Sequence, residues 1–187
     1  MIVVDGGSDD GTPELAAGLC DRLLRAPRGR ASQMNAGARL ACGDALVFLH
    51  ADTRLPAAAD ALIGAALRTH FWGRFDVDIA GRHPLLPVVA GAMNLRSRLT
   101  GIATGDQAIF VRRQEFQGFP EIALMEDVAF SATMKRAAAP ACLRARALTS
   151  GRRWEKRGVL RTVWLMWRLR LAFALGADPA RLAERYG

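Results

Sequence analysis

Three groups of acidic residues lie where they could bind a metal ion or accept a proton, and two of them follow apolar runs. Asp5 directly follows the run 2–4, and Asp52 comes two residues after His50 at the end of the run 45–49. Side-chain alternation along this strand puts His50 and Asp52 on the same side, pointing into the same crevice. Carboxylates are hard oxygen ligands for Mg²⁺ or Mn²⁺, which can clamp a diphosphate. Each residue also has a structural explanation, Asp5 and Asp52 as helix or turn caps and His50 as a satisfied strand-end histidine.

The third acidic group, Glu126-Asp127, opens a predicted helix. Acids are favourable there simply because they complement the helix dipole. A carboxylate in the same place could instead act as a general base that deprotonates a hydroxyl nucleophile. The pair alone leaves both explanations open.

Two arginine-containing segments could bind phosphate. Residues 28–30 are Arg-Gly-Arg and precede Asn35, whereas Arg153 and Trp154 follow a Ser-Gly turn. Arginine can bind phosphate through two hydrogen bonds, and an indole can wall a sugar pocket. A solvated arginine beside a core tryptophan is the alternative. The sequence has neither a G-x-G-x-x-G fingerprint nor a G-K-[ST] loop, which argues against a dinucleotide site and a Walker loop.

Alternating apolar runs and helical patterns must position these residues. In the first half, predicted strands at 2–4, 22–25 and 45–49 are followed by helices starting near 12, 31 and 56. In the second half, strands are predicted at 71–80, 107–111 and 142–148, and helices at 85–99, 126–138 and from 158. Strand–helix repeats indicate parallel strands joined by crossovers, with ligands at the carboxyl ends of the strands. We therefore expect a three-layer α/β/α fold with a mostly parallel central sheet and C-terminal helices.

Composition limits the class of protein. The chain has 187 residues, 51% of them apolar, which suits one compact domain and excludes a disordered or disulfide-scaffold protein. A net charge of +8 favours an anionic partner. The sequence has no signal for nucleic-acid recognition beyond this charge. Three widely spaced cysteines, Cys20, Cys42 and Cys142, are expected to be reduced core thiols of a cytoplasmic protein.

Taken in order, these motifs resemble family 2 glycosyltransferases, in particular a small bacterial subgroup. The matching segments are VDGGS at 4–8, LHADT at 49–53, GDQAIFVRR at 105–113, LMEDV at 124–128 and RRW at 152–154. The resemblance implies the GT-A fold and a hexosyltransferase-like enzyme. Such an enzyme transfers a sugar, with inversion, from a nucleotide-diphosphate sugar to a hydroxyl acceptor.

The resemblance also implies roles for individual residues. Asp127 matches the catalytic base and Glu126 its neighbour, while Asp52 matches the last acid of a metal-binding D-x-D motif in which His50 replaces the first. Asp5 matches the acid that contacts the nucleobase. The expected nucleotide site as a whole contains Asp5, Gly6, Gly7, Arg30, Asn35 and Ala51. The expected acceptor or diphosphate side contains Gly105, Asp106, Arg153 and Trp154, of which the last two match a Q-x-x-R-W motif only in part.

The resemblance divides the chain into a domain at 1–157, with a nucleotide-sugar half at about 1–70 and an acceptor half at about 71–157, and a helical segment at 158–187. The family pattern begins with a strand and loop upstream of residues 2–4, so we expect a depleted donor site and weak nucleotide binding. A degenerate binding module that has lost turnover is the alternative function.

The last helical segment is basic and amphipathic. Trp164, Trp167 and Leu171 share one face, which suits an anionic lipid surface and a lipid-linked acceptor at the inner face of the membrane. Packing on the domain or on a second subunit, as in a homodimer, explains the same pattern.

Overall fold

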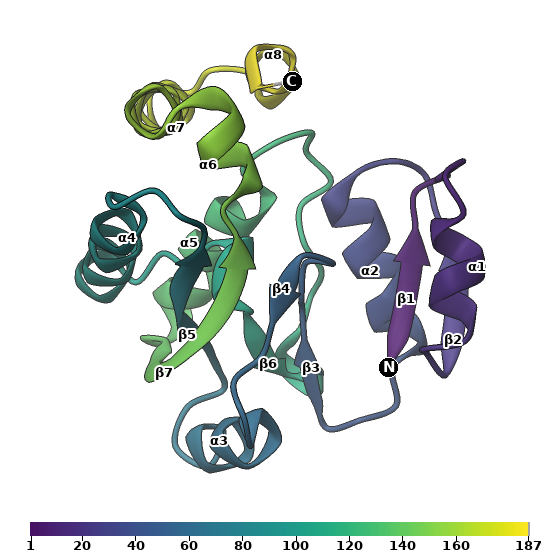
Figure 1. Ribbon diagram of the computed structural model, residues 1–187. Helices are drawn as coiled ribbons and strands as arrows, with labels where there is room; N and C mark the ends of the chain where they lie inside the picture. The colour runs from purple at the N-terminus through teal and green to yellow at the C-terminus, as the bar shows by residue number, and fades with distance from the viewer. Residues whose placement is uncertain (187) are drawn as a thin grey trace.

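The computed structural model describes residues 1–186 (Figure 1). Its strands are β1 (Ile2–Asp5), β2 (Arg22–Arg25), β3 (Ala45–Val47), β4 (Thr53–Arg54), β5 (Trp72–Ala80), β6 (Phe110–Arg112) and β7 (Ala141–Ser150). Its helices are α1 (Thr12–Ala17), α2 (Arg30–Leu40), α3 (Ala59–Ala66), α4 (Leu86–Thr100), α5 (Glu126–Ala137), α6 (Arg152–Arg157), α7 (Val159–Ala174) and α8 (Pro179–Tyr186). Two 3₁₀ turns, η1 (Gly105–Gln107) and η2 (Arg113–Glu115), flank β6. The mixed α/β class is as expected.

The strands form two sheets, and the pairing is less parallel than expected. β1 and β2 make a two-stranded parallel sheet, and the other five strands have the order β3-β6-β5-β7-β4. Within the larger sheet only β5 and β7 are parallel, whereas β3–β6, β5–β6 and β4–β7 are antiparallel. The expectation of a mostly parallel central sheet therefore holds only in part, because β6 and β4 run against their neighbours.

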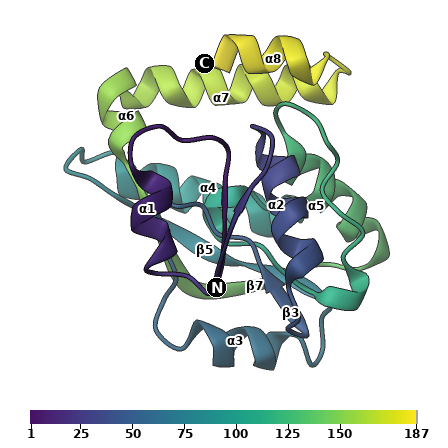
Figure 2. The same ribbon diagram turned by 90° about the vertical axis from the view of Figure 1, so that its right-hand side faces the viewer.

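Helix α2 joins the two sheets. Its Gly37 lies so close to β1 that an added Cβ would come within 3.1 Å of a Val4 methyl. Gln33 on the same helix donates a 2.9 Å hydrogen bond to the Val4 carbonyl of β1. The helix also packs against the larger sheet, through a buried cluster that includes Ala31 and Leu46. Figure 1 shows α2 beside β1, and Figure 2 shows the same neighbourhood from the side.

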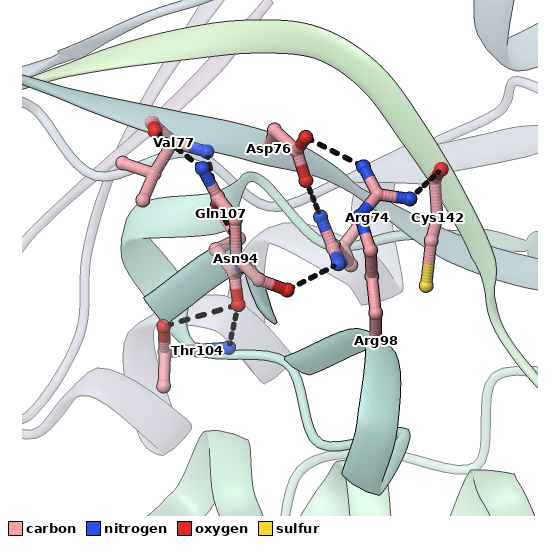
Figure 3. A network of polar contacts seen from close by, with 8 residues as sticks. All are labelled: Arg74, Asp76, Val77, Asn94, Arg98, Thr104, Gln107 and Cys142. Carbon is pink, nitrogen blue, oxygen red and sulfur yellow. Dashed lines mark hydrogen bonds and ion pairs between the residues drawn. The ribbon is translucent and has the colours of Figure 1, made fainter. Parts of the chain in front are cut away.

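A buried polar network ties β5 to α4 (Figure 3). The fully buried Arg74 pairs with Asp76, which also accepts a 2.5 Å bond from Arg98. Asn94 of α4 exchanges two hydrogen bonds with the backbone of Val77, at 2.8 and 2.9 Å. Buried polar groups of this kind must be paired to be tolerated, so the network fixes the position of α4 on the sheet.

The C-terminal helices cover the start of α5. Leu169 of α7 and Leu182 of α8 form a buried cluster with Leu124 and Met125. Figure 2 shows α7 lying along one side of the molecule with α8 folded back beside it. None of the helices in residues 1–186 has the length and hydrophobicity needed to cross a bilayer.

The cysteines do not lie in the core. Cys42 is exposed, and Cys20 and Cys142 are partly exposed. The expectation of core thiols is wrong, because small apolar neighbours in the sequence do not ensure burial when the residue ends a helix or lies at a strand edge.

Candidate active site

A pocket lies where β3 ends and α5 begins. Its cavity volume is about 10 Å³, which is room for about one water molecule. Its polar lining comes from three segments far apart in the sequence, and consists of His50, Gly105, Glu126 and Asp127. Its apolar floor is formed by Met34, Phe48, Ile109 and Phe119. The two expected catalytic acids and the expected acceptor-side Gly105 therefore share one cavity with His50.

The acid pair occupies the first turn of α5, as the sequence predicts. The helix begins directly after Met125, which is held in the left-handed region at φ 71° and is packed into the core. One Asp127 carboxylate oxygen, Oδ2, accepts a 2.8 Å bond from the Gly105 amide, and Oδ1 accepts one from the Val128 amide at 2.7 Å. These two amides fix the direction in which the Asp127 carboxylate points.

Glu126 is almost entirely buried, with 2% of its surface exposed. Burial and the neighbouring Asp127 charge raise the pKa of Glu126, while Arg30 and His50 oppose this shift. The Arg30 guanidinium lies 3.8 Å from the Glu126 carboxylate. A raised pKa keeps a proton on Glu126 to a higher pH than usual, which limits the negative charge that accumulates beside Asp127.

His50 and Asp106 face each other across the pocket rim. Their Nδ1 and Oδ1 atoms lie 3.5 Å apart, and Thr149 approaches the same Asp106 oxygen at 3.4 Å. Burial works against ionisation, but the His50 hydrogen bond and the charges of His50 and Arg30 lower the pKa of Asp106. The His50 ring also lies against the backbone of Gly105, where any Cβ would overlap it. A glycine is therefore required at position 105.

The polar network of Figure 3 reaches this rim through η1. Gln107 donates to Asn94 of α4 at 3.4 Å and accepts from the Thr104 amide at 3.2 Å. The turn that carries Gly105 and Asp106 is thereby hydrogen-bonded to the buried side of α4, which supports the Asp127 and His50 contacts.

The expected pairing of His50 with Asp52 is wrong. Strand β3 ends at Val47, and the Thr53 amide bonds to the His50 carbonyl at 3.0 Å, so residues 50–53 form a turn. Ala51 and Asp52 lie at its exposed corners while His50 turns inward. Side-chain alternation does not apply in a turn, and neither Ala51 nor Asp52 lines the pocket.

A metal site is not preformed at these residues. Within residues 1–186, His, Cys, Asp and Glu side chains do not gather into any group of three that could hold an ion. The two nearest side chains, His50 and Asp106, pair with each other, and His50 Nε2 is buried against Gly105. The side chains as they stand do not fit a divalent cation.

Asp5 organises its own loop. Its carboxylate accepts bonds from the Gly7 amide at 2.8 Å and from the Ser8 hydroxyl at 2.6 Å, and the Ser8 amide approaches it at 3.0 Å. The Ser8 hydroxyl and amide bonds lower the pKa of Asp5, although burial opposes them. Gly6 packs against the Gln33 side chain of α2. Asp5, Gly6 and Gly7 thus shape the loop after β1 and do not line the pocket of the acid pair.

Arginines converge beside the acid pair. Arg30 lies between Glu126 and the side chain of Tyr186 at the end of α8. The Arg153 guanidinium stacks 3.5 Å from the centre of the Tyr186 ring and donates to its carbonyl at 2.8 Å. Arg30 also acts on the pKa of Arg153, so the two cations are close neighbours. Trp154, by contrast, is half-buried against Leu86 and Val159 in a core cluster.

Asn35 makes a structural contact. Its amide donates to the Phe119 carbonyl at 2.9 Å, and its carbonyl accepts from the Phe119 amide at 2.8 Å. Asn35 is 9% exposed, and Phe119 forms part of the pocket floor. The Asn35 side chain thus holds the floor of the pocket in place, and its expected contact with the nucleotide stays a prediction.

Arg96 of α4 was not singled out by the sequence analysis. Its Nε and Nη2 atoms are buried and find no hydrogen-bond partner among residues 1–186. Burial lowers the pKa of Arg96, while the Asp127 charge acts against this shift. A cation near enough to Asp127 for the charges to interact, with unused donors, is suited to an anionic ligand. The sequence offered one signal for this residue: Arg96 lies at the margin of the buried face of α4, and α4 contains no acidic residue.

Comparison with known proteins bears on the first part of the chain, which does not include Glu126 and Asp127. A search of curated proteins found no match to the chain. Residues 1–79, which contain Asp5, Arg30, Asn35, His50 and Asp52, match the family model for glycosyl transferase family 2. The match supports a glycosyltransferase of family 2, a class that implies a nucleotide-sugar donor and an acceptor substrate.

Proposed function

We propose that the protein transfers a glycosyl group, with inversion, from a nucleotide-diphosphate sugar to a hydroxyl acceptor. The observation that carries the proposal is the acid pair of the buried Glu126 and the partly exposed Asp127 in the same pocket as His50, beside two arginines. The family match over residues 1–79 supports the donor class. An intact acid pair argues against the degenerate binding module.

Asp127 is the general base of this proposal. Its carboxylate is oriented by two backbone amides and lines the pocket, and the residue is partly exposed, so an acceptor hydroxyl can reach it. As the acceptor oxygen attacks the anomeric carbon, its proton passes to Asp127, and the bond from that carbon to the phosphate oxygen breaks. Glu126, whose pKa is raised, stays protonated over a wider pH range and so leaves the full negative charge to Asp127.

Arginines receive the departing diphosphate. Arg30 lies 3.8 Å from Glu126 and close to Arg153, and Arg96 has buried, unused donors near Asp127, although none of these arginines lines the pocket itself. Fixed cations that face a developing negative charge stabilise the transition state most where water is excluded. Tyr186 contacts both Arg30 and Arg153 in this structure, so diphosphate oxygens would replace Tyr186 as the partner of the two guanidinium groups.

The remaining roles stay predictions. The nucleobase is assigned to Asp5 with Gly6 and Gly7, and the diphosphate or acceptor side to Asp106. A divalent metal on Asp52 and His50 would supply further neutralisation of the diphosphate. It requires a rearrangement of residues 50–53, and no step of the mechanism above depends on it.

The test compares Asp127→Asn with the unchanged protein. Release of nucleoside diphosphate is followed with a panel of UDP-, GDP- and dTDP-sugars and simple hydroxyl acceptors, and UDP binding is measured by calorimetry. Loss of a general base lowers turnover by about 10²–10⁴-fold, and UDP binding should be unchanged. Asp60→Asn, at an exposed position of α3, is the matched control. Lost UDP binding with retained turnover would contradict the assignment.

A further inference from the structure

The outer face of α7 is an unusually apolar surface. Its exposed residues follow one another at intervals of three or four, with exposed fractions of 60–80%: Leu160, Trp164, Trp167, Leu171 and Leu175. The opposite face of the helix is buried through Val159, Thr162 and Leu169. At 100° per residue the two faces are about 180° apart, so the exposed strip points directly away from the domain.

Helix α4 carries a second strip of the same kind. Val88, Leu95 and Leu99 are 59–78% exposed, on the side opposite the buried Leu86 and Ala90. The two helices are neighbours, because α7 contributes Val159 and Val163 to the cluster that buries the inner face of α4. Figure 1 shows α4 and α7 one above the other on the same side of the molecule. The two exposed strips, carried by neighbouring helices, are called here the α4/α7 face.

The charges around this face have a single sign. Neither α4 nor α7 contains an aspartate or glutamate, and Arg161, Arg168 and Arg170 of α7 flank the exposed strip. The two arginines of α4 are used elsewhere, because Arg96 has buried donors near Asp127 and Arg98 pairs with Asp76. Arg168 lies over the Trp164 ring with its guanidinium carbon 4.4 Å from the ring centre. Exposed tryptophans flanked by arginines suit the interface between lipid headgroups and acyl chains, where the rings are partly buried and the cations meet phosphate.

We propose that the α4/α7 face binds the surface of an anionic lipid bilayer, with α7 lying parallel to it. The charge pattern favours this occupant over a second copy of the chain. In a two-fold dimer the same patch would face itself and bring arginine against arginine without an acid to compensate. Since α6, which carries Arg153, leads directly into α7, the bound molecule would hold its pocket close to the lipid surface. The proposal concerns binding alone and does not depend on transferase activity.

The test uses the full chain and sedimentation with two kinds of vesicle, phosphatidylcholine alone and phosphatidylcholine mixed with phosphatidylserine in equal parts. Binding is expected to the mixed vesicles, to weaken as salt rises, and to shift the tryptophan emission to shorter wavelength. Trp167→Glu combined with Leu171→Glu should reduce the partition coefficient at least about tenfold. Arg161→Gln combined with Arg168→Gln should reduce it about 25-fold, at about fivefold for each arginine near the surface.

A matched control distinguishes binding through this surface from non-specific hydrophobic binding. Leu15→Glu combined with Leu19→Glu makes the same change at two leucines near α1 that are 74% and 75% exposed. This control should bind vesicles as the unchanged protein does. Equal loss in both double variants would overturn the proposal. A second outcome would also overturn it. In this outcome light scattering shows that the unchanged protein is a dimer and that the Trp167→Glu, Leu171→Glu variant is a monomer, while neither protein binds vesicles.

Discussion

Replacement of Asn35 by alanine tests whether this residue supports the pocket or contacts the nucleotide. The side chain makes two buried hydrogen bonds with the backbone of Phe119, 84 positions away along the chain. Each bond contributes about 0.5–1.5 kcal/mol net, and a backbone group left buried without a partner costs about 1–3 kcal/mol. Because Asn35 is 9% exposed, water replaces these bonds poorly, and we expect Asn35→Ala to lower the free energy of unfolding by about 2–4 kcal/mol.

Asn35→Asp sharpens the test. An ionised aspartate can still accept from the Phe119 amide, but it faces the Phe119 carbonyl with a second negative oxygen in place of a donor. It should be more destabilising than alanine at neutral pH. On acidification the protonated carboxyl regains a donor, so the difference should shrink.

Urea unfolding followed by tryptophan fluorescence measures these differences, because the buried Trp72 packs within the same core cluster as Phe119. UDP binding of the folded variants is measured by calorimetry. The reasoning fails if Asn35→Ala unfolds within about 0.5 kcal/mol of the unchanged protein yet loses UDP affinity severely. That result would restore the nucleotide role that the sequence resemblance implies.

Two further predictions concern buried charge. The raised pKa of Glu126 means that the folded state binds the Glu126 proton more tightly than the unfolded chain does. The free energy of unfolding should therefore fall as pH rises above the ordinary pKa of 4.5. In urea titrations across this range, Glu126→Gln should show a weaker dependence of the free energy of unfolding on pH. Arg74→Met leaves Asp76 in the core with only the partly exposed Arg98 as a partner and should cost about 3–5 kcal/mol. Asp76→Asn added to Arg74→Met should recover part of this loss in the same unfolding assay, and a further loss would contradict the pairing.

Local signals in the sequence predicted the elements well. The predicted helix that begins at Glu126 is confirmed. It could be predicted because acids in its first turn and basic residues in its last turn complement the helix dipole, an effect that needs no distant partner. Strand β5 lies within one residue of its predicted start, because a long run with β-forming residues needs no distant partner to be identified.

Features that depend on distant partners were not predictable in the same way. The order β3-β6-β5-β7-β4 depends on which edges meet, and a strand–helix pattern does not reveal that β6 inserts antiparallel between β3 and β5. The turn at 50–53 separates His50 from Asp52 although the apolar run before it suggested a longer strand. Arg96 was missed because its unused donors and its nearness to Asp127 arise only from the seating of α4.

The division of the strands into two sheets affects how the molecule can open. β1 and β2 pair only with each other, and α2 supplies their packing toward the larger sheet through Gly37 and Gln33. Fraying of this small unit exposes less apolar surface than separation of β5 from β7, where eight residue pairs are matched, with a register shift between Phe75 and Asp76. Amide protons of β1 should therefore exchange with solvent through a local opening, at a lower free energy than the global unfolding that releases those of β5.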